Sequence, residues 1–184
     1  STIYYSGDES EASPHTHAGV AIMIKNKHLN KIMDIDPIDD RTMNIVMKGT
    51  VPHTFINTYM YTAKDYEKKP HKYEELSKII RSANAQGPTF IGGDLIARIQ
   101  NQDDQGDARI IGPHTFDKHN TKISLEEGAS ENRSHLLGLC KKESLTIVNT
   151  WFDTPQNKLP THKHPSIAPH TPLKRQPGYP HVGS

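Results

Sequence analysis

Asp94 is the side chain of this sequence best placed to do chemistry, because it follows a short apolar run and two glycines. The run Thr89-Phe90-Ile91 predicts a buried strand, so Gly92-Gly93-Asp94 would lie at its carboxyl end. Ligands gather beyond the carboxyl ends of strands in α/β sheets, and glycines let a backbone or substrate approach closely there. The pattern makes Asp94 a candidate metal or phosphate ligand, although Gly-Gly-Asp is also typical of a simple turn.

Other clusters of polar residues carry weaker signals. Two histidine pairs at alternate positions, His15 with His17 and His162 with His164, suggest transition-metal binding, but they lie in irregular Pro- or Ser-containing segments without nearby cysteine. The acidic stretch 103–107 lacks the distal glutamate of a calcium loop, which favours a solvated turn. The lone Cys140 excludes an internal disulfide, and we expect it to be a small buried helix residue.

Composition indicates one globular chain without a strong electrostatic preference. The 184 residues are 33% hydrophobic with a mean hydropathy of -0.72, so either the core is thin or part of the chain packs on something else. The net charge of +1 gives no general attraction to nucleic acid, so DNA contact would need a local patch. The longest obvious apolar run, Val20–Ile24, is too short to span a membrane. We expect an intracellular protein, soluble or peripheral, and either a processed chain or an excerpt because it begins at Ser1.

The hydrophobic pattern predicts the elements that would position Asp94. Short strands are expected at 20–24, 43–48 and 54–61, together forming an antiparallel sheet, with a core strand at 89–93 and another strand at 145–150. Residues 66–82 have the spacing of a helix with one buried stripe and Pro70 in its first turn. A second helix should begin near Ser130, whose side chain can cap it, and end by Ser144. Residues 100–110 indicate a solvated loop.

The character of the sequence changes after Asp153. Seven of the thirteen prolines fall between Pro155 and Pro180. Because proline fixes φ and removes a donor, residues 154–184 should form neither a helix nor a central strand. We expect an extended Pro/His-rich arm, either a flexible tail or a segment docked on a partner.

Several short segments surround Gly92–Ile99 in a particular order: Ile3–Gly7, His17–Ile24, Phe55–Tyr61, Ile111–His114, Glu131–Leu137, Leu145–Phe152 and Lys158–His162. This series resembles the endonuclease/exonuclease/phosphatase superfamily, most closely the endonuclease domain of LINE-type retrotransposons and its craniofacial-development-protein-like relatives. The resemblance runs from Ile3 to about Tyr179. It implies an α+β fold, a partial four-layer α/β-sandwich of two mainly antiparallel sheets flanked by helices, with residues 1–153 as an incomplete domain.

The resemblance also implies roles for individual residues. Asn57 and Tyr59 match the family's N-x-Y pattern, in which the tyrosine hydroxyl points at phosphate, although an aromatic residue on a strand also suits core packing. The implied set is Asp94 and Tyr59 as catalytic residues, Asp94 as the metal ligand, and Asn57, His114, Asn149 and Trp151 as substrate-binding residues. The alternatives are that His114 is an ordinary surface histidine, and that Asn149 and Trp151 mark the end of a strand.

The sequence departs from that family where the chemistry is done. Ile96 replaces the asparagine that holds the scissile phosphate, and the family's metal-binding glutamate and terminal aspartate and histidine have no counterpart between Ser1 and Ser184. Hydrolysis by this plan needs Mg²⁺ held by several oxygens, and losing one positioned group costs on the order of 10²- to 10⁴-fold in rate. We therefore expect little or no nuclease activity and no cofactor, with Mg²⁺ relevant only if some activity remains.

Three functions stay open. The first, which we favour, is a catalytically impaired relative of a retrotransposon endonuclease, retained as a non-enzymatic binding or scaffold module. The second is a fragment of a Mg²⁺-dependent DNA endonuclease, and the third is a structural subunit of a large assembly anchored by the arm. An incomplete sandwich exposes sheet edges and apolar faces, so we expect a protein partner or a second copy to cover them.

Overall fold

The computed structural model describes residues 1–7, 19–99, 108–115 and 127–155. Its strands are β1 (Thr2–Ser6), β2 (Val20–Ile24), β3 (Ile32–Asp39), β4 (Thr42–Met47), β5 (His53–Tyr59) and β6 (Thr89–Asp94). Its helices are α1 (Lys69–Asn84) and α2 (Glu127–Glu143), with short 3-10 helices η1 (Asn26–Lys31), η2 (Ala63–Lys68) and η4 (Val148–Thr150). Both histidine pairs, the acidic stretch 103–107 and residues 156–184 of the expected arm lie outside the described residues.

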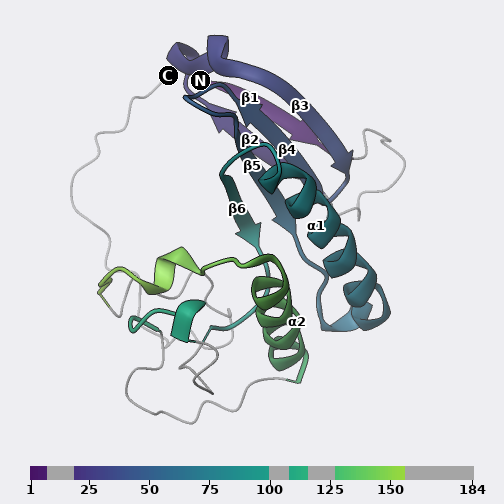
Figure 1. Ribbon diagram of the computed structural model, residues 1–184. Helices are drawn as coiled ribbons and strands as arrows, with labels where there is room; N and C mark the ends of the chain where they lie inside the picture. The colour runs from purple at the N-terminus through teal and green to yellow at the C-terminus, as the bar shows by residue number, and fades with distance from the viewer. Residues whose placement is uncertain (8–18, 100–107, 116–126, 156–184) are drawn as a thin grey trace, which may run out of the picture.

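The strands form two sheets in a mixed α+β fold. β1 and β2 pair antiparallel as a two-stranded sheet, whereas the larger sheet has the order β3-β4-β5-β6 (Figure 1). β5 and β6 run parallel because α1 connects them, and the other pairs are antiparallel. The expectation that residues 20–24 share a sheet with β4 and β5 is wrong, because β3 occupies the free edge of β4. β3 is a polar edge strand in which Pro37 is tolerated, so its pattern did not predict a strand.

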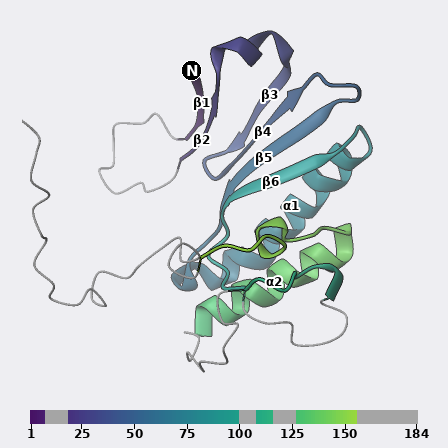
Figure 2. The same ribbon diagram turned by 90° about the vertical axis from the view of Figure 1, so that its left-hand side faces the viewer.

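Different elements pack on the two faces of the larger sheet, as Figure 2 shows. Along β5, Thr54, Ile56 and Thr58 are buried, and Ile56 belongs to the core that α1 and α2 build with the sheet. The alternate residues of β5 face the β1–β2 pair, which packs Val20 and Ile24 on β4 in a second, smaller core. The domain therefore has one core on each side of a single sheet.

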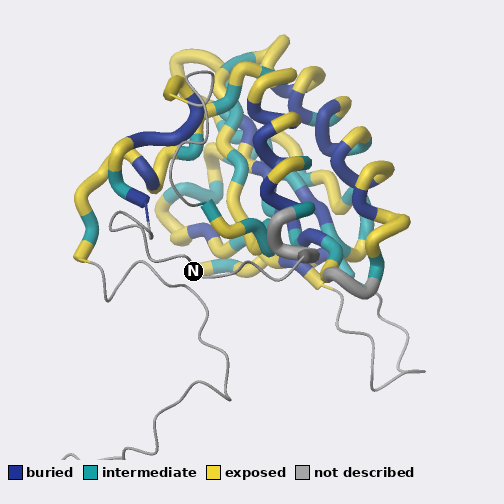
Figure 3. Tube along the Cα trace, turned by 90° about the horizontal axis from the view of Figure 1, so that it is seen from below, coloured by how far each residue is buried: buried dark blue, intermediate teal, exposed yellow. Residues whose placement is uncertain are grey.

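α1 agrees closely with the predicted helix. It begins at Lys69 rather than Tyr66, with Pro70 in its first turn as expected. The predicted stripe supplies Tyr73, Leu76 and Ile80 to the core, whereas Tyr66 lies in η2 and is exposed. Figure 3 shows buried residues recurring along one side of the helices and exposed residues along the other.

α2 is longer at its start than predicted. It begins at Glu127, so Ser130 lies inside the helix and is not its N-cap. The preceding residues contain no proline and include Ala129, a strong helix former, so the helix extends through them. At its other end Ser144 has φ of 55°, and the N–H of Leu145 donates to the carbonyl oxygen of Cys140 at 2.9 Å, a Schellman-type cap. Cys140 is buried as predicted, and burial raises its pKa to about 11.

The predicted strand over residues 145–150 is wrong. Ile147 makes a single parallel bridge with Ile111, and η4 follows immediately. Thr150 explains the difference, because both its hydroxyl and its N–H donate to the carbonyl oxygen of Ile147, at 2.6 and 3.1 Å. Such local bonds from a threonine compete with a strand ladder. In the described part of the chain, no helix is both long and apolar enough to cross a membrane.

Candidate functional site

The carboxyl ends of β5 and β6 bring three of the predicted site residues together. Tyr59 is the register partner of Asp94, and Asn57 is the partner of Gly92. In-register residues of parallel neighbours point to the same face, so Asn57, Tyr59 and Asp94 all lie on the face that carries the β1–β2 pair. There the side-chain amide of Asn57 donates to the carbonyl oxygen of Ala21 at 2.8 Å, which ties β5 to β2.

Asp94 forms hydrogen bonds with backbone groups close to its own strand end. Its side-chain Oδ1 accepts from the N–H of Ile96 at 3.0 Å, and its backbone oxygen accepts from the N–H of Met60 at 2.9 Å. Among the described residues no three His, Cys, Asp or Glu side chains gather as a metal site. Mg²⁺ prefers several oxygen ligands, and among the described residues Asp94 is not part of such a group.

The turn after β6 keeps a conformation that its sequence suits poorly. Ile96 has φ of 49°, in the left-handed region that asparagine tolerates and a β-branched residue disfavours. Gly93 has φ of 127°, and a Cβ there would lie 1.9 Å from the carbonyl oxygen of Thr58, so only glycine fits. A Cβ on Gly92 would meet nothing within 4 Å. Of the two glycines, Gly93 is therefore the one that close backbone approach requires.

Arg41 lies over Tyr59 and was not anticipated from the sequence. Its guanidinium carbon is 5.0 Å from the centre of the Tyr59 ring and 4.5 Å from that of Tyr61, within the range of a cation–π contact. The Tyr59 ring also packs against the smaller core. Arg41 lies in the turn between β3 and β4, so only the pairing of β4 with β5 brings it to Tyr59.

The other three predicted residues gather elsewhere, around η4. The N–H of His114 donates to the carbonyl oxygen of Thr150 at 2.9 Å, and its Nδ1 is 3.5 Å from Oδ1 of Asp153. Asn149 is exposed and Trp151 is 44% exposed. A Cβ on Gly112 would lie 2.3 Å from the Thr150 oxygen, so this glycine permits the two segments to touch. The six predicted residues thus form two groups of three.

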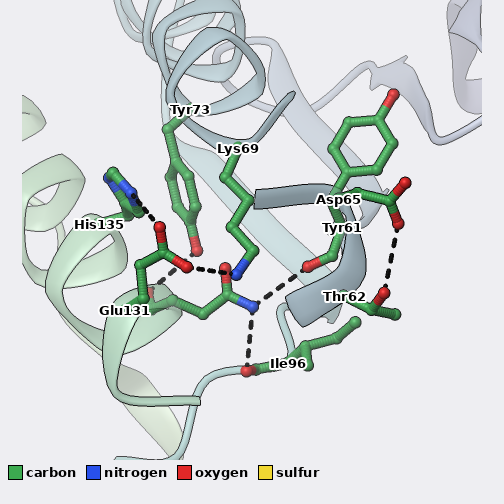
Figure 4. A network of polar contacts seen from close by, with 9 residues as sticks. Tyr61, Thr62, Asp65, Lys69, Tyr73, Ile96, Glu131 and His135 are labelled. Atoms are coloured by element: carbon green, nitrogen blue, oxygen red, sulfur yellow. Dashed lines mark hydrogen bonds and ion pairs between the residues drawn. The ribbon is translucent and has the colours of Figure 1, made fainter. Parts of the chain in front are cut away.

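A buried polar network joins the two helices, and Figure 4 shows it. The ammonium group of Lys69, a fully buried side chain, donates to Glu131 at 2.7 Å. The amide of Asn132, also fully buried, donates to the backbone oxygens of Tyr61 and Ile96, at 3.2 and 3.3 Å. The Tyr73 hydroxyl donates to the carbonyl oxygen of Asn132, and desolvation by burial, with a contribution from Cys140, raises the pKa of Tyr73. These groups form hydrogen bonds within the network, so we infer that the network stabilises the fold.

An apolar groove lies between β2 and the β5–β6 half of the larger sheet. This inter-sheet groove has a volume of about 630 Å³ and is lined by residues including Met23, Lys25, His28, Phe55, Phe90 and Gly92. Met23 is 64% exposed, and the rings of Phe55 and Phe90 stack with centroids 5.2 Å apart while staying 36% and 50% exposed. Sequence reasoning missed this site, because Phe55 and Phe90 look like ordinary core residues of their strands.

Comparisons with protein-family models, with curated proteins and with solved structures found no match.

Proposed function

We propose that this chain is a catalytically impaired relative of a retrotransposon-type endonuclease that serves as a non-enzymatic binding module. The resemblance in its sequence supports the ancestry, and a partial sandwich of that type is the fold we assign to it. The observation that carries the binding role is the inter-sheet groove, where two stacked phenylalanines and a methionine remain open to solvent. Binding sites are typically concave and lined mainly by apolar and aromatic side chains, as this groove is.

The proposed loss of catalysis rests on Asp94. Its carboxylate accepts a hydrogen bond from the turn at Ile96, and it belongs to no group of three His, Cys, Asp or Glu side chains among the described residues. A single carboxylate is a weak ligand set for Mg²⁺ and leaves the charge on a phosphodiester unneutralised. Residual function therefore reduces to binding and positioning.

A nicking assay on supercoiled plasmid in Mg²⁺ tests the catalytic half of the proposal. We expect the 184-residue chain and its Asp94→Ala variant to give the same background conversion. Nicking by the wild-type chain that Asp94→Ala abolishes would refute it.

A fluorescent dye that binds apolar surface tests the other half. We expect the native chain to enhance bis-ANS fluorescence, and Phe90→Ser to reduce that enhancement more than Phe152→Ser, a matched change at another exposed phenylalanine. Native protein that leaves the dye dark would contradict a binding role for the groove.

A further inference from the structure

We infer that the inter-sheet groove binds one extended strand of a partner protein, which pairs with β2 and lies antiparallel to it. This inference rests on the proposed binding function and names the occupant of the same groove. The partner strand has an apolar centre, an acidic start and a basic end. It would extend the two-stranded sheet over the uncovered half of the larger one.

The shape of the groove favours a strand over a compact ligand. The β1–β2 pair packs on β4, where Met43 and Ile45 are fully buried, but leaves Phe55 and Phe90 of β5 and β6 uncovered. In the described part of the chain β2 has a paired neighbour on one edge only. A strand added at its other edge would lie over the two phenylalanine rings, since stacked sheets lie about 10 Å apart. Backbone bonds to β2 and side chains against the rings are the two parts of β-strand addition.

The two ends of the groove differ in the charge of the side chains beside them. Lys25 is the one permanently charged side chain in its lining, and His28 lies beside it. Lys25 follows β2 as the N-cap of η1, and His28 lies within η1. Ile32 after η1 pairs with Met47, so this end adjoins the beginning of β5. Asp94 lies just outside the lining at the opposite end, where β6 finishes after Gly93, and its side chain is exposed. The groove is thus apolar, with a basic side chain at one end of its lining and an acidic side chain just beyond the other end.

These ends fix the direction of the occupant. β2 runs toward Lys25, so a strand antiparallel to β2 begins beside Lys25 and His28 and ends beside Asp94. Complementary charge then requires acidic residues at its start and basic residues at its end. The antiparallel direction matches the β1–β2 pair, and antiparallel ladders are slightly more stable per residue than parallel ones. β2 has five residues, so a five-residue apolar centre with alternating side chains matches its length.

The test uses the 184-residue chain and two fluorescent nine-residue peptides, read by polarisation. One peptide has two glutamates, a Val-Thr-Val-Thr-Val centre and two lysines, and the other has the charged ends exchanged. We expect the acid-first peptide to bind more tightly, by about tenfold, because both of its ends meet opposite charge. A preference for the exchanged peptide would overturn the antiparallel arrangement, and binding of neither would overturn the inference.

Variants identify the site. Phe90→Ser should weaken the acid-first peptide about tenfold, as expected for a central aromatic anchor, while Phe152→Ser should leave it unchanged. Lys25→Glu, at an exposed position, should weaken binding of the acid-first peptide and reduce the difference in affinity between the two peptides. Circular dichroism of each variant confirms folding. Binding that is indifferent to Phe90→Ser and Lys25→Glu in folded protein would overturn the site.

Sedimentation separates a partner from a second copy. We expect the wild-type chain to sediment as a monomer whose groove is open to the peptide. A dimer that Phe90→Ser disperses would overturn the inference in favour of self-association. Failure of the peptides leaves the nicking result untouched, whereas Asp94-dependent nicking would remove the proposed function whatever the peptides do.

Discussion

Truncation of Asn132 gives the sharpest test of how this fold is held together. Its amide, which is fully buried, links α2 to the segments that leave β5 and β6, through the backbone oxygens of Tyr61 and Ile96. Each bond contributes about 1 kcal/mol, and removing a buried amide group leaves a cavity worth about another 1 kcal/mol. The side-chain oxygen of Asn132 is buried without a hydrogen-bond partner, and losing it returns about 1 kcal/mol.

We therefore expect Asn132→Ala to lower the free energy of unfolding by about 2 kcal/mol, which corresponds to roughly 4–8 °C in Tm for a chain of this size. Urea unfolding followed by circular dichroism measures the change. Asn149→Ala is the matched control, because Asn149 is exposed and its truncation should cost less than about 0.5 kcal/mol. Equal midpoints for the two variants would refute the reasoning that the buried amide connects these elements.

Three further predictions follow from single positions. Ser144→Gly should raise the free energy of unfolding by about 0.5–1 kcal/mol, because Ser144 caps α2 at a φ of 55° that glycine adopts freely; urea midpoints check this, and Ser144→Ala should give no such gain. Hydrogen bonds from Arg81 and then Ser77 lower the pKa of Glu143, so its contribution is present above its unfolded pKa and disappears as pH falls through the lowered folded value. Wild-type protein should accordingly lose more stability than Glu143→Gln when urea unfolding at pH 7 is compared with unfolding at pH 3, and parallel losses would count against that ion pair. Cys140, buried and with a pKa of about 11, should react with a thiol reagent only after the chain unfolds, so fast labelling of native protein would contradict its burial.

Local sequence signals predicted the elements that depend on local physics. The stripe of Tyr73, Leu76 and Ile80 with Pro70 before it was enough to place α1, and the apolar run before Gly92 was enough to place β6. The expected burial of that strand was wrong, because β6 is the edge strand of its sheet and Phe90 is 50% exposed. The position of Asp94 at a strand end followed from the same run. The strand predicted for Leu145–Thr150 was wrong because the turn that Thr150 closes with Ile147 outweighs the preference of its alternating apolar residues for a strand.

The parts that could not be predicted depend on partners far along the chain. From the sequence, Lys69 and Lys72 would be expected on the surface. In the fold, Lys69 is paired with Glu131, 62 residues later, and Lys72 is paired with Asp39, 33 residues earlier. The inter-sheet groove exists because the β1–β2 pair covers one half of the larger sheet and leaves Phe55 and Phe90 bare, a fact of tertiary arrangement. The order of residues along the chain does not indicate which distant residues will pair, which is why the polar network and the groove were both missed.

The two buried lysines of α1 also bear on how the domain comes apart. Lys69 is bound to α2 through Glu131, and Lys72 is bound both to the end of β3 through Asp39 and to Glu75 of its own helix. Separating α2 from α1 would leave the buried ammonium ion of Lys69 without its carboxylate, a state that is costly unless water enters at the same time. Opening between the two helices is therefore penalised, and α1 and α2 should lose their structure together.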